Sequence, residues 1–176
     1  MRLAPRKRPL PLLRILRRVR DHLPDRIRLT ATIIGDGPQR HLLESYLARH
    51  GMSDWVSLPG RYSRERIRAA YRRSDVFVAP ANLESFGIAA LEARCAGLPV
   101  VAKAHTGIRE FVADGDEGLL VTSDDEMAFA LARLARSAGL RERIACYNRT
   151  MPATVNWVDV VARYEATYKR ACDVIG

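Results

Sequence analysis

The chain has 176 residues, enough for one domain with a sizeable core. Its net charge of +9, from 29 basic and 20 acidic residues, leaves three kinds of partner open: nucleic acid, an anionic membrane surface, or a phosphate-bearing small ligand. No apolar stretch approaches the ~20 residues of a membrane-spanning helix, and the N-terminus lacks the apolar segment and cleavage site of a signal peptide.

The N-terminal part combines a basic loop with an amphipathic basic helix. Apolar residues recur there at helical spacing, with arginines between them: Leu12, Leu13, Leu16, Val19 and Leu23. Such a helix packs its apolar stripe on a sheet or lies on an anionic membrane, and we expect the first. The loop before it carries Arg2 and Lys7, either as a disordered basic tail or as an anion site.

Two strand–loop–helix units follow. Residues 28–35 are predicted as a strand, and the turn Gly35-Asp36-Gly37-Pro38 opens a helix that ends near Gly51. The Gly-x-Gly pattern alone is a weak dinucleotide signal. Residues 55–58 are predicted as the next strand, and the loop after it contains Arg61 and Tyr62, which either stack on a nucleobase or lie on the surface. Ser63 then caps a helix that runs to residue 73.

The central stretch has the pattern of a parallel crossover. An apolar run over 76–79 predicts a buried strand, a polar turn covers 82–85, and good helix formers run over 86–96. Gly97 ends this helix, Pro99 follows, and 100–102 reads as the next buried strand. Strand, loop, helix and strand in this order indicate an α/β sheet with parallel strands.

Two carboxylates flank the start of the central helix. Gly87 lacks a Cβ, so a ligand can approach the backbone there, and the free N–H groups of the first turn form an anion site. If the whole interval were helical, Glu84 and Glu92 would lie about 12 Å apart on roughly the same side. That is wide for the paired carboxylates of a glycoside hydrolase, which lie roughly 5–9.5 Å apart. It suits two acceptors at the ends of one extended ligand; the alternative is a solvated glutamate pair.

The remaining elements complete one domain over 1–176. A loop covers 104–112, a strand 117–121, and helices 124–134 and 140–148. A final helix is marked by Asn156-Trp157, Tyr164 and Tyr168. The fold prediction is α/β, a Rossmann-like parallel sheet with helices on both faces. The loops with the candidate residues all fall beyond the carboxyl ends of the strands, where such sheets bind ligands.

The central stretch resembles a known family. Glu84-Ser85-Phe86-Gly87-Ile88, Leu91-Glu92-Ala93 and Ala96-Gly97-Leu98-Pro99-Val100-Val101 resemble the Glu-x7-Glu signature of the retaining glycosyltransferases of family 4, or glycosyl transferases group 1. The resemblance extends over nearly the whole chain. It implies a GT-B fold of two Rossmann-like domains, of which this chain resembles the C-terminal, donor-binding one. The chain is about half the family's usual length, so a fragment, a truncated product and one subunit of a split enzyme all stay open.

The resemblance implies a site for a nucleoside-diphosphate sugar. The residues expected in catalysis are Glu84, which accepts hydrogen bonds from the sugar hydroxyls, and Arg2 and Lys7, which offset the charge of the departing diphosphate. The residues expected to bind the donor are Gly35, Gly37, Arg61, Tyr62, Glu84, Ser85, Phe86, Gly87, Ile88 and Glu92, the last through the ribose hydroxyls. The family usually has Gly after the lysine, and Arg8 departs from this.

The expected reaction is transfer of a sugar to an unknown acceptor with retention, without metal or other cofactor. The expected partners are the donor, a missing N-terminal domain or partner subunit, and peripherally an anionic membrane, but no nucleic acid. The scattered cysteines have no metal-ligand spacing and favour a cytoplasmic location, with association at the inner face of a membrane left open: Cys95, Cys146 and Cys172. Two other classes remain: a non-catalytic nucleotide or nucleotide-sugar binding module, and a basic binder of nucleic acid or membrane surfaces.

Overall fold

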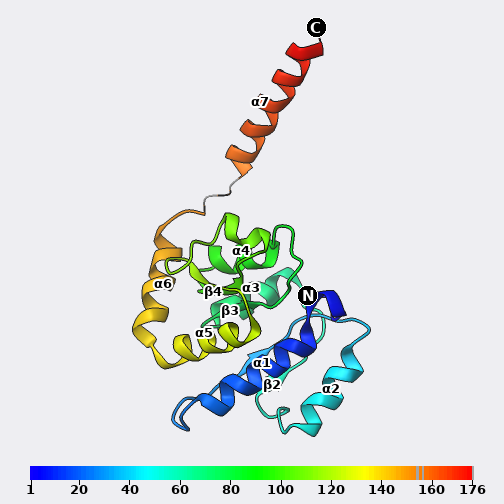
Figure 1. Cartoon of the computed structure of the whole chain (residues 1–176), viewed down its shortest axis with the longest axis vertical. Coiled ribbons are helices and arrows are strands. Elements are labelled where there is room, and N and C mark those ends of the chain that lie inside the picture. Colours follow the sequence, from blue (N-terminus) through cyan, green and yellow to red (C-terminus); the bar gives the residue numbers. More distant parts are fainter. Residues whose placement is uncertain (154, 156, 176) are drawn as a thin grey trace.

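The computed structural model describes residues 1–153, 155 and 157–175, and in the last range it describes the side chains of 161, 162 and 164–172 (Figure 1). The helices are α1 (Pro9–His22), α2 (Arg40–Arg49), α3 (Arg64–Arg72), α4 (Ile88–Cys95), α5 (Asp124–Arg136), α6 (Ala138–Thr150) and α7 (Trp157–Ile175), with 3-10 turns η1 (Pro5–Lys7) and η2 (Gly107–Glu110). The strands are β1 (Ala31–Thr32), β2 (Val56–Ser57), β3 (Phe77–Ala79), β4 (Val100–Lys103) and β5 (Gly118–Val121).

All strand pairs are parallel, which confirms the predicted α/β class, but the strands form two groups. One sheet has the order β1-β2 and the other β3-β4-β5. The first residues of the chain add to the edge of β1, because Arg2 forms a parallel bridge with Asp36 and the Met1 ammonium group donates to the Ile34 carbonyl at 2.5 Å. The strand predicted over 28–35 is shortened to β1, in which Thr32 is exposed.

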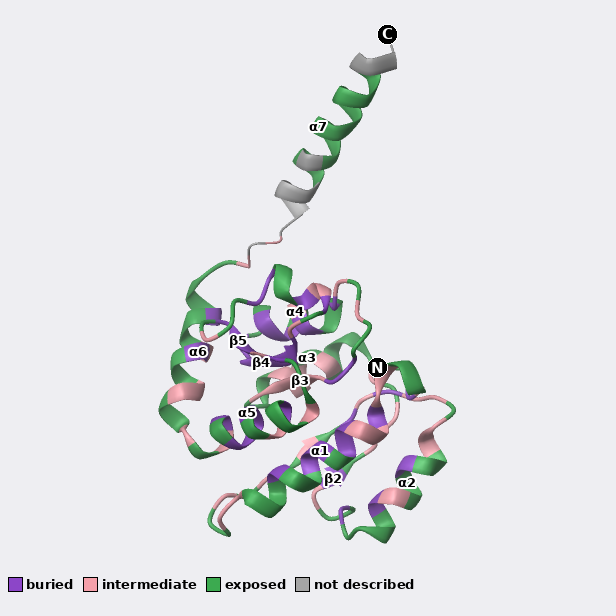
Figure 2. Cartoon of the chain, viewed as in Figure 1, coloured by how far each residue is buried: buried purple, intermediate pink, exposed green. Residues whose placement is uncertain are grey.

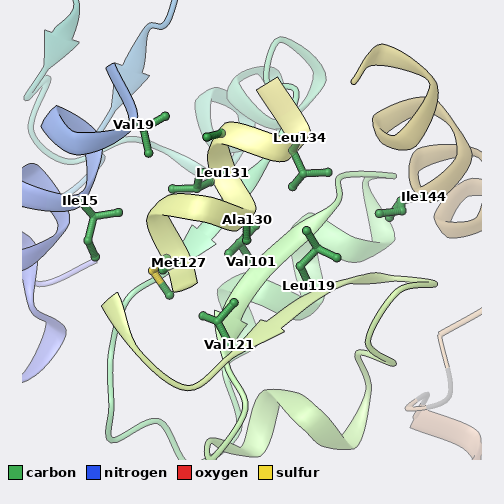
Figure 3. Close-up of a cluster of buried hydrophobic side chains, with 11 residues drawn as sticks. Ile15, Val19, Val101, Leu119, Val121, Met127, Ala130, Leu131, Leu134 and Ile144 are labelled. Atoms are coloured by element: carbon green, nitrogen blue, oxygen red, sulfur yellow. The ribbon is translucent and has the colours of Figure 1, made fainter. Parts of the chain in front are cut away.

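Helix α1 connects the two groups of strands. Its residues Leu12, Leu13 and Leu16 pack with Ile33 and Val56 of the β1-β2 group. On the other group, α1 contributes to a core that lies mainly between α5, β4 and β5, with members Ile15, Val19, Val101, Leu119, Val121, Met127, Ala130, Leu131, Ala132, Leu134 and Ile144 (Figure 3). The apolar stripe is buried, as expected for a helix packed on a sheet, so it is not available to insert into a membrane.

Two helix starts show where local sequence signals succeed and fail. The Ser63 hydroxyl accepts from the Arg66 N–H at 3.3 Å, which confirms the predicted cap of α3. The prediction that α4 begins near Phe86 was wrong, because Gly87 adopts φ +88° and the helix starts only at Ile88, without a side-chain cap. The polar turn before it therefore stays a loop, and Glu84 lies outside the helix.

A buried ion pair holds the C-terminal end of the body. The Arg94 guanidinium, 1% exposed, donates to Glu117 at 2.6 Å and to the Met151 carbonyl at 2.7 Å, where α6 ends. Beyond this point α7 extends away from the rest of the chain (Figure 1) and exposes the side chains of Tyr164 and Tyr168 (Figure 2). The final helix that Tyr164 and Tyr168 mark in the sequence is therefore present as α7.

Part of that final-helix prediction falls on residues 156 and 157. Asn156 and the side chain of Trp157 lie outside the described residues. Among the helices that the structure describes, none combines the length and apolar character needed to cross a membrane.

Candidate functional site

A cavity of about 510 Å³ opens at the carboxyl end of β1 and gathers part of the predicted site. Its lining contains five residues that the sequence singled out: Arg2, Gly35, Gly37, Arg61 and Tyr62. The remaining lining residues are Met1, Ile34, Asp36, Pro38 and Ile67. The loops after two successive strands therefore meet the N-terminal segment around one hollow, as the parallel topology requires.

The two glycines of this cavity leave room for the backbone of residues 1–3, which passes against them. A Cβ on Gly35, which has φ +142°, would lie 1.7 Å from the Met1 carbonyl oxygen. A Cβ on Gly37 would lie 2.6 Å from the Leu3 carbonyl oxygen. Any larger residue would displace the N-terminal segment, and Arg2 with it, from the cavity.

The aromatic residue of the cavity already has a cation on its ring. The Arg66 guanidinium carbon lies 4.2 Å from the centroid of the Tyr62 ring. The neighbouring Arg61 is exposed. One face of Tyr62 is therefore covered, and a planar ligand has the other face or the Arg61 guanidinium to stack on.

A second group of predicted residues lies at the loop after β3. The Lys7 ammonium nitrogen is 2.5 Å from Glu84 Oε2, and both side chains are partly exposed. The Glu84 carbonyl accepts from the Gly107 N–H at 2.9 Å, so the loop after β4 holds this loop in place. The structure therefore brings two of the three predicted catalytic residues into direct contact, while Arg2 lies in the cavity five positions before Lys7.

Arg8, next to this pair, adopts a conformation that few non-glycine residues adopt. Its φ of +53° is the one positive value among non-glycine residues in the described part of the chain. The guanidinium donates to both carboxylate oxygens of Asp124, at 2.7 and 2.9 Å, and to Asn82 Oδ1 and the Pro80 carbonyl at 3.0 Å. These contacts tie the loop that carries Lys7 to the loop that carries Glu84.

Asp124 is the shared acceptor of two cations. The hydrogen bonds from Arg8, reinforced by Lys103, lower the pKa of Asp124 to about 2 against the opposing effect of burial. Lys103 is 2% exposed, and its ammonium group lies 2.9 Å from Asp124. Sequence reasoning missed Arg8, Asp124 and Lys103 as a group because their partners are up to 116 positions apart.

The N-terminus of α4 follows Glu84 by four residues. A Cβ on Gly87 would lie 2.6 Å from Ile108 Cγ1, so η2 packs against the glycine backbone, and its lack of a side chain serves packing as well as access. Phe86 packs on Phe111 with ring centroids 5.4 Å apart, whereas Ser85 and Ile88 are exposed. The first backbone N–H groups of α4 precede its first intrahelical hydrogen bond, which Ala90 donates.

Glu92 lies on α4 and has a partner that sequence reasoning did not consider. The Tyr71 hydroxyl lies 3.3 Å from Glu92 Oε2 and 3.2 Å from the Ala89 carbonyl oxygen. Because Glu84 precedes the helix, the 12 Å separation expected for two helical positions does not apply. Among the residues that the structure describes, His, Cys, Asp and Glu side chains form no group of three that could hold a metal ion.

A second cavity, of about 430 Å³, lies at the end of α1 and contains none of the predicted residues. It is lined by Asp21, His22, Leu23, Pro24, Arg26 and Arg136. Since this segment precedes β1, the cavity faces the amino ends of the strands, away from the loops described above.

The family model of Glycosyl transferases group 1 matches residues 1–151. The chain belongs to this family. Among its curated relatives, it is 34% identical over 157 residues to the D-inositol 3-phosphate glycosyltransferase of Xylanimonas cellulosilytica, covering 86% of this chain and 37% of that protein. It is 35% identical over 123 residues to the alpha-D-kanosaminyltransferase of Streptomyces kanamyceticus, covering 69% and 32%. This chain of the group 1 family therefore spans about a third of the length of these relatives.

Solved structures locate the group 1 chain within the larger fold. It matches the C-terminal domain of the group 1 glycosyl transferase LpcC from Francisella tularensis with a TM-score of 0.73 and 26% identity, covering 84% of this chain and 78% of that one. It matches the pneumococcal O-GlcNAc transferase GtfA, solved with UDP and GlcNAc, with a TM-score of 0.73 and 27% identity, covering 84% and 30%. The chain thus corresponds to the C-terminal half of GT-B glycosyltransferases, as the sequence predicted.

Proposed function

We propose that this domain binds the nucleoside-diphosphate sugar donor of a retaining glycosyltransferase of family 4. The observation that carries the proposal is the Lys7–Glu84 contact beside the α4 N-terminus, on the same side of the strands as the cavity of Arg2, Arg61 and Tyr62. An extended ligand with a planar base, a charged middle and a hydroxyl-rich end needs these groups in this order. UDP and GlcNAc in the similar GtfA structure support this ligand class.

Each part of the donor has a proposed partner. The base stacks on Arg61 or on the open face of Tyr62, and Gly35 and Gly37 let the ligand approach the backbone. Glu92 accepts from the ribose hydroxyls. The diphosphate is held by Lys7 and Arg2, together with the backbone N–H groups at Ser85, Phe86, Gly87 and Ile88.

Catalysis in this scheme is charge stabilisation. When the bond between the sugar and the diphosphate breaks, negative charge develops on the departing phosphate oxygens, and fixed cations lower the energy of that state. Glu84 orients the sugar through its hydroxyls. We propose that no metal or other cofactor takes part, because Lys7 and Arg2 supply the positive charge.

The proposed site accounts for the donor, and the acceptor needs a second surface. We propose that an N-terminal domain or partner subunit supplies it and closes the cleft, and that the chain alone is inactive. We also propose a cytoplasmic location, since the free cysteines suit a reducing compartment. Contact with an anionic membrane would involve the exposed arginines of α1, since its apolar stripe is buried.

Calorimetric titration with UDP and GDP tests the proposal. Replacing Glu92 by alanine removes a charged acceptor and should weaken binding of the preferred nucleotide by roughly tenfold or more. Asp54→Ala, an exposed carboxylate in the loop before β2, is the matched control and should leave affinity unchanged. Unchanged affinity in Glu92→Ala would contradict the ribose role.

Two further measurements separate the other classes. Product formation when an acceptor-binding domain is supplied distinguishes an enzyme from a binding module. A steep fall of binding to oligonucleotides or anionic vesicles with salt, without nucleotide binding, would favour a basic surface binder instead.

A further inference from the structure

Tyr71 connects two helices through a single hydroxyl group. It lies in the last turn of α3, is half-buried, and packs its ring edge-on against Phe77 of β3, with centroids 6.1 Å apart and an interplanar angle of 68°. This ring contact fixes where the hydroxyl points. The hydroxyl lies against α4, where the Ala89 carbonyl and the Glu92 carboxylate are both within hydrogen-bonding distance.

The hydroxyl acts as a donor at this position. Both neighbours are acceptors, one a backbone carbonyl and the other a carboxylate, so the phenol proton is directed toward them. Burial, followed by the nearby charge of Glu92, raises the pKa of Tyr71 to about 12. The proton is therefore retained throughout the neutral range.

Glu92 depends on this contact for its orientation. In the part of the chain that the structure describes, Tyr71 is the one side chain that hydrogen-bonds to it. The residue is exposed, and an unsupported glutamate at a helix surface samples several rotamers. With Oε2 accepting from Tyr71, Oε1 keeps its full accepting capacity for a ligand, and Oε2 keeps a second lone pair.

We propose that Tyr71 is a positioning residue that holds Glu92 ready for the ribose and so sets the preference of the site for ribonucleotides over 2′-deoxyribonucleotides. The inference rests on the proposed function, in which Glu92 accepts from the ribose hydroxyls. It adds that the recognition depends on α3 as well as α4. Ordering the carboxylate before the ligand arrives lowers the entropy lost on binding.

The test compares UDP with 2′-deoxy-UDP by calorimetry in wild type and Tyr71→Phe, which keeps the ring and its contact with Phe77. Wild type should prefer UDP, and Tyr71→Phe should reduce that preference by about threefold to tenfold, the range for one lost hydrogen bond of ordinary strength. Affinity for 2′-deoxy-UDP, which keeps only the 3′ hydroxyl, should fall less than affinity for UDP. Tyr46→Phe, which removes the hydroxyl of another half-buried tyrosine, is the control and should leave both affinities unchanged.

The outcomes separate this inference from the proposed function. If both affinities fall equally in Tyr71→Phe, or neither changes, Tyr71 is structural and the inference is wrong while the donor site stands. If wild type binds UDP and 2′-deoxy-UDP equally, the ribose role of Glu92 is wrong and the inference with it. If wild type does not bind UDP or GDP, the proposed function itself is wrong. Glu92→Gln should lose the preference, and adding Tyr71→Phe should reduce it no further.

Discussion

Glu84→Gln is expected to have opposite effects on two ligands that differ only by a sugar. In the unliganded chain, Glu84 Oε2 lies 2.5 Å from the Lys7 ammonium group. A diphosphate that binds Lys7 must therefore displace Glu84. Removing the carboxylate charge removes this competition, so UDP should bind the variant more tightly than wild type.

The size of the effect follows from exposure of the pair. The two side chains are 36% and 23% exposed, so solvent screens the interaction. Ion pairs of this kind contribute about 0.2–1 kcal/mol, and the upper value corresponds to about a fivefold decrease in the Kd for UDP. For UDP-glucose the sign reverses, because the additional affinity that Glu84 gives to the sugar hydroxyls is lost.

Isothermal titration of both ligands measures this difference. Lys7→Gln should weaken UDP binding, and adding Glu84→Gln to it should produce no recovery, since the competing contact is already gone. Asp54→Asn changes the net charge by the same amount in the loop before β2 and is the control. Weaker UDP binding by Glu84→Gln would refute the competition between carboxylate and phosphate.

Three further predictions concern stability. Arg94→Leu leaves Glu117 buried without its charge partner and should lower the urea-unfolding free energy by about 3 kcal/mol or more, whereas Leu at both positions should recover much of the loss. Gly87→Ala should lower the free energy of unfolding by about 1–2 kcal/mol because of its positive φ, and by a further amount because the new Cβ meets the isoleucine side chain of η2. Gly115→Ala has the same φ of +88° and open space around it, so it measures the first contribution alone. Equal losses in the two variants would contradict the packing role of Gly87. The lowered pKa of Asp124 stabilises the fold above pH 3.8, and this contribution should disappear as pH falls through about 2. The free energy of unfolding of Asp124→Asn should therefore depend less steeply on pH over this range. An unchanged slope would contradict the lowered pKa of Asp124.

Elements with strong local signals were predictable from the sequence. The apolar run before Pro80 and the glycine at position 97 correctly located β3, the end of α4 and β4, because strand burial and helix termination depend on nearby residues. The cap at Ser63 is equally local. The spacing of Arg2, Gly35, Gly37, Arg61 and Tyr62 correctly predicted loops that meet, because parallel strands align their carboxyl ends.

Features that depend on distant partners were not predictable. Arginine itself gives no signal for the left-handed conformation of Arg8, and the one hint is the glycine that the family usually has at this position. The contacts of Arg8 to Asp124 and the loop after β3 stabilise this conformation in the folded chain. Tyr71 packs its ring on Phe77 of β3, while its hydroxyl contacts α4. The sequence did offer one signal for this contact. It is a tyrosine near the end of α3, followed by β3 and then by α4, which carries the glutamate.

The division of the strands into two groups affects how the molecule loses its structure. In the described part of the chain, β1 pairs with β2 and the bridge at Asp36, β3 pairs with β4, and α1 packs on both groups. The larger group holds Glu84 and Glu92, while the smaller one holds the cavity, so the two ends of the ligand contact units with separate cores. We expect the smaller unit to lose its amide protection at lower denaturant concentration, and a bound nucleoside-diphosphate sugar to merge the two transitions into one.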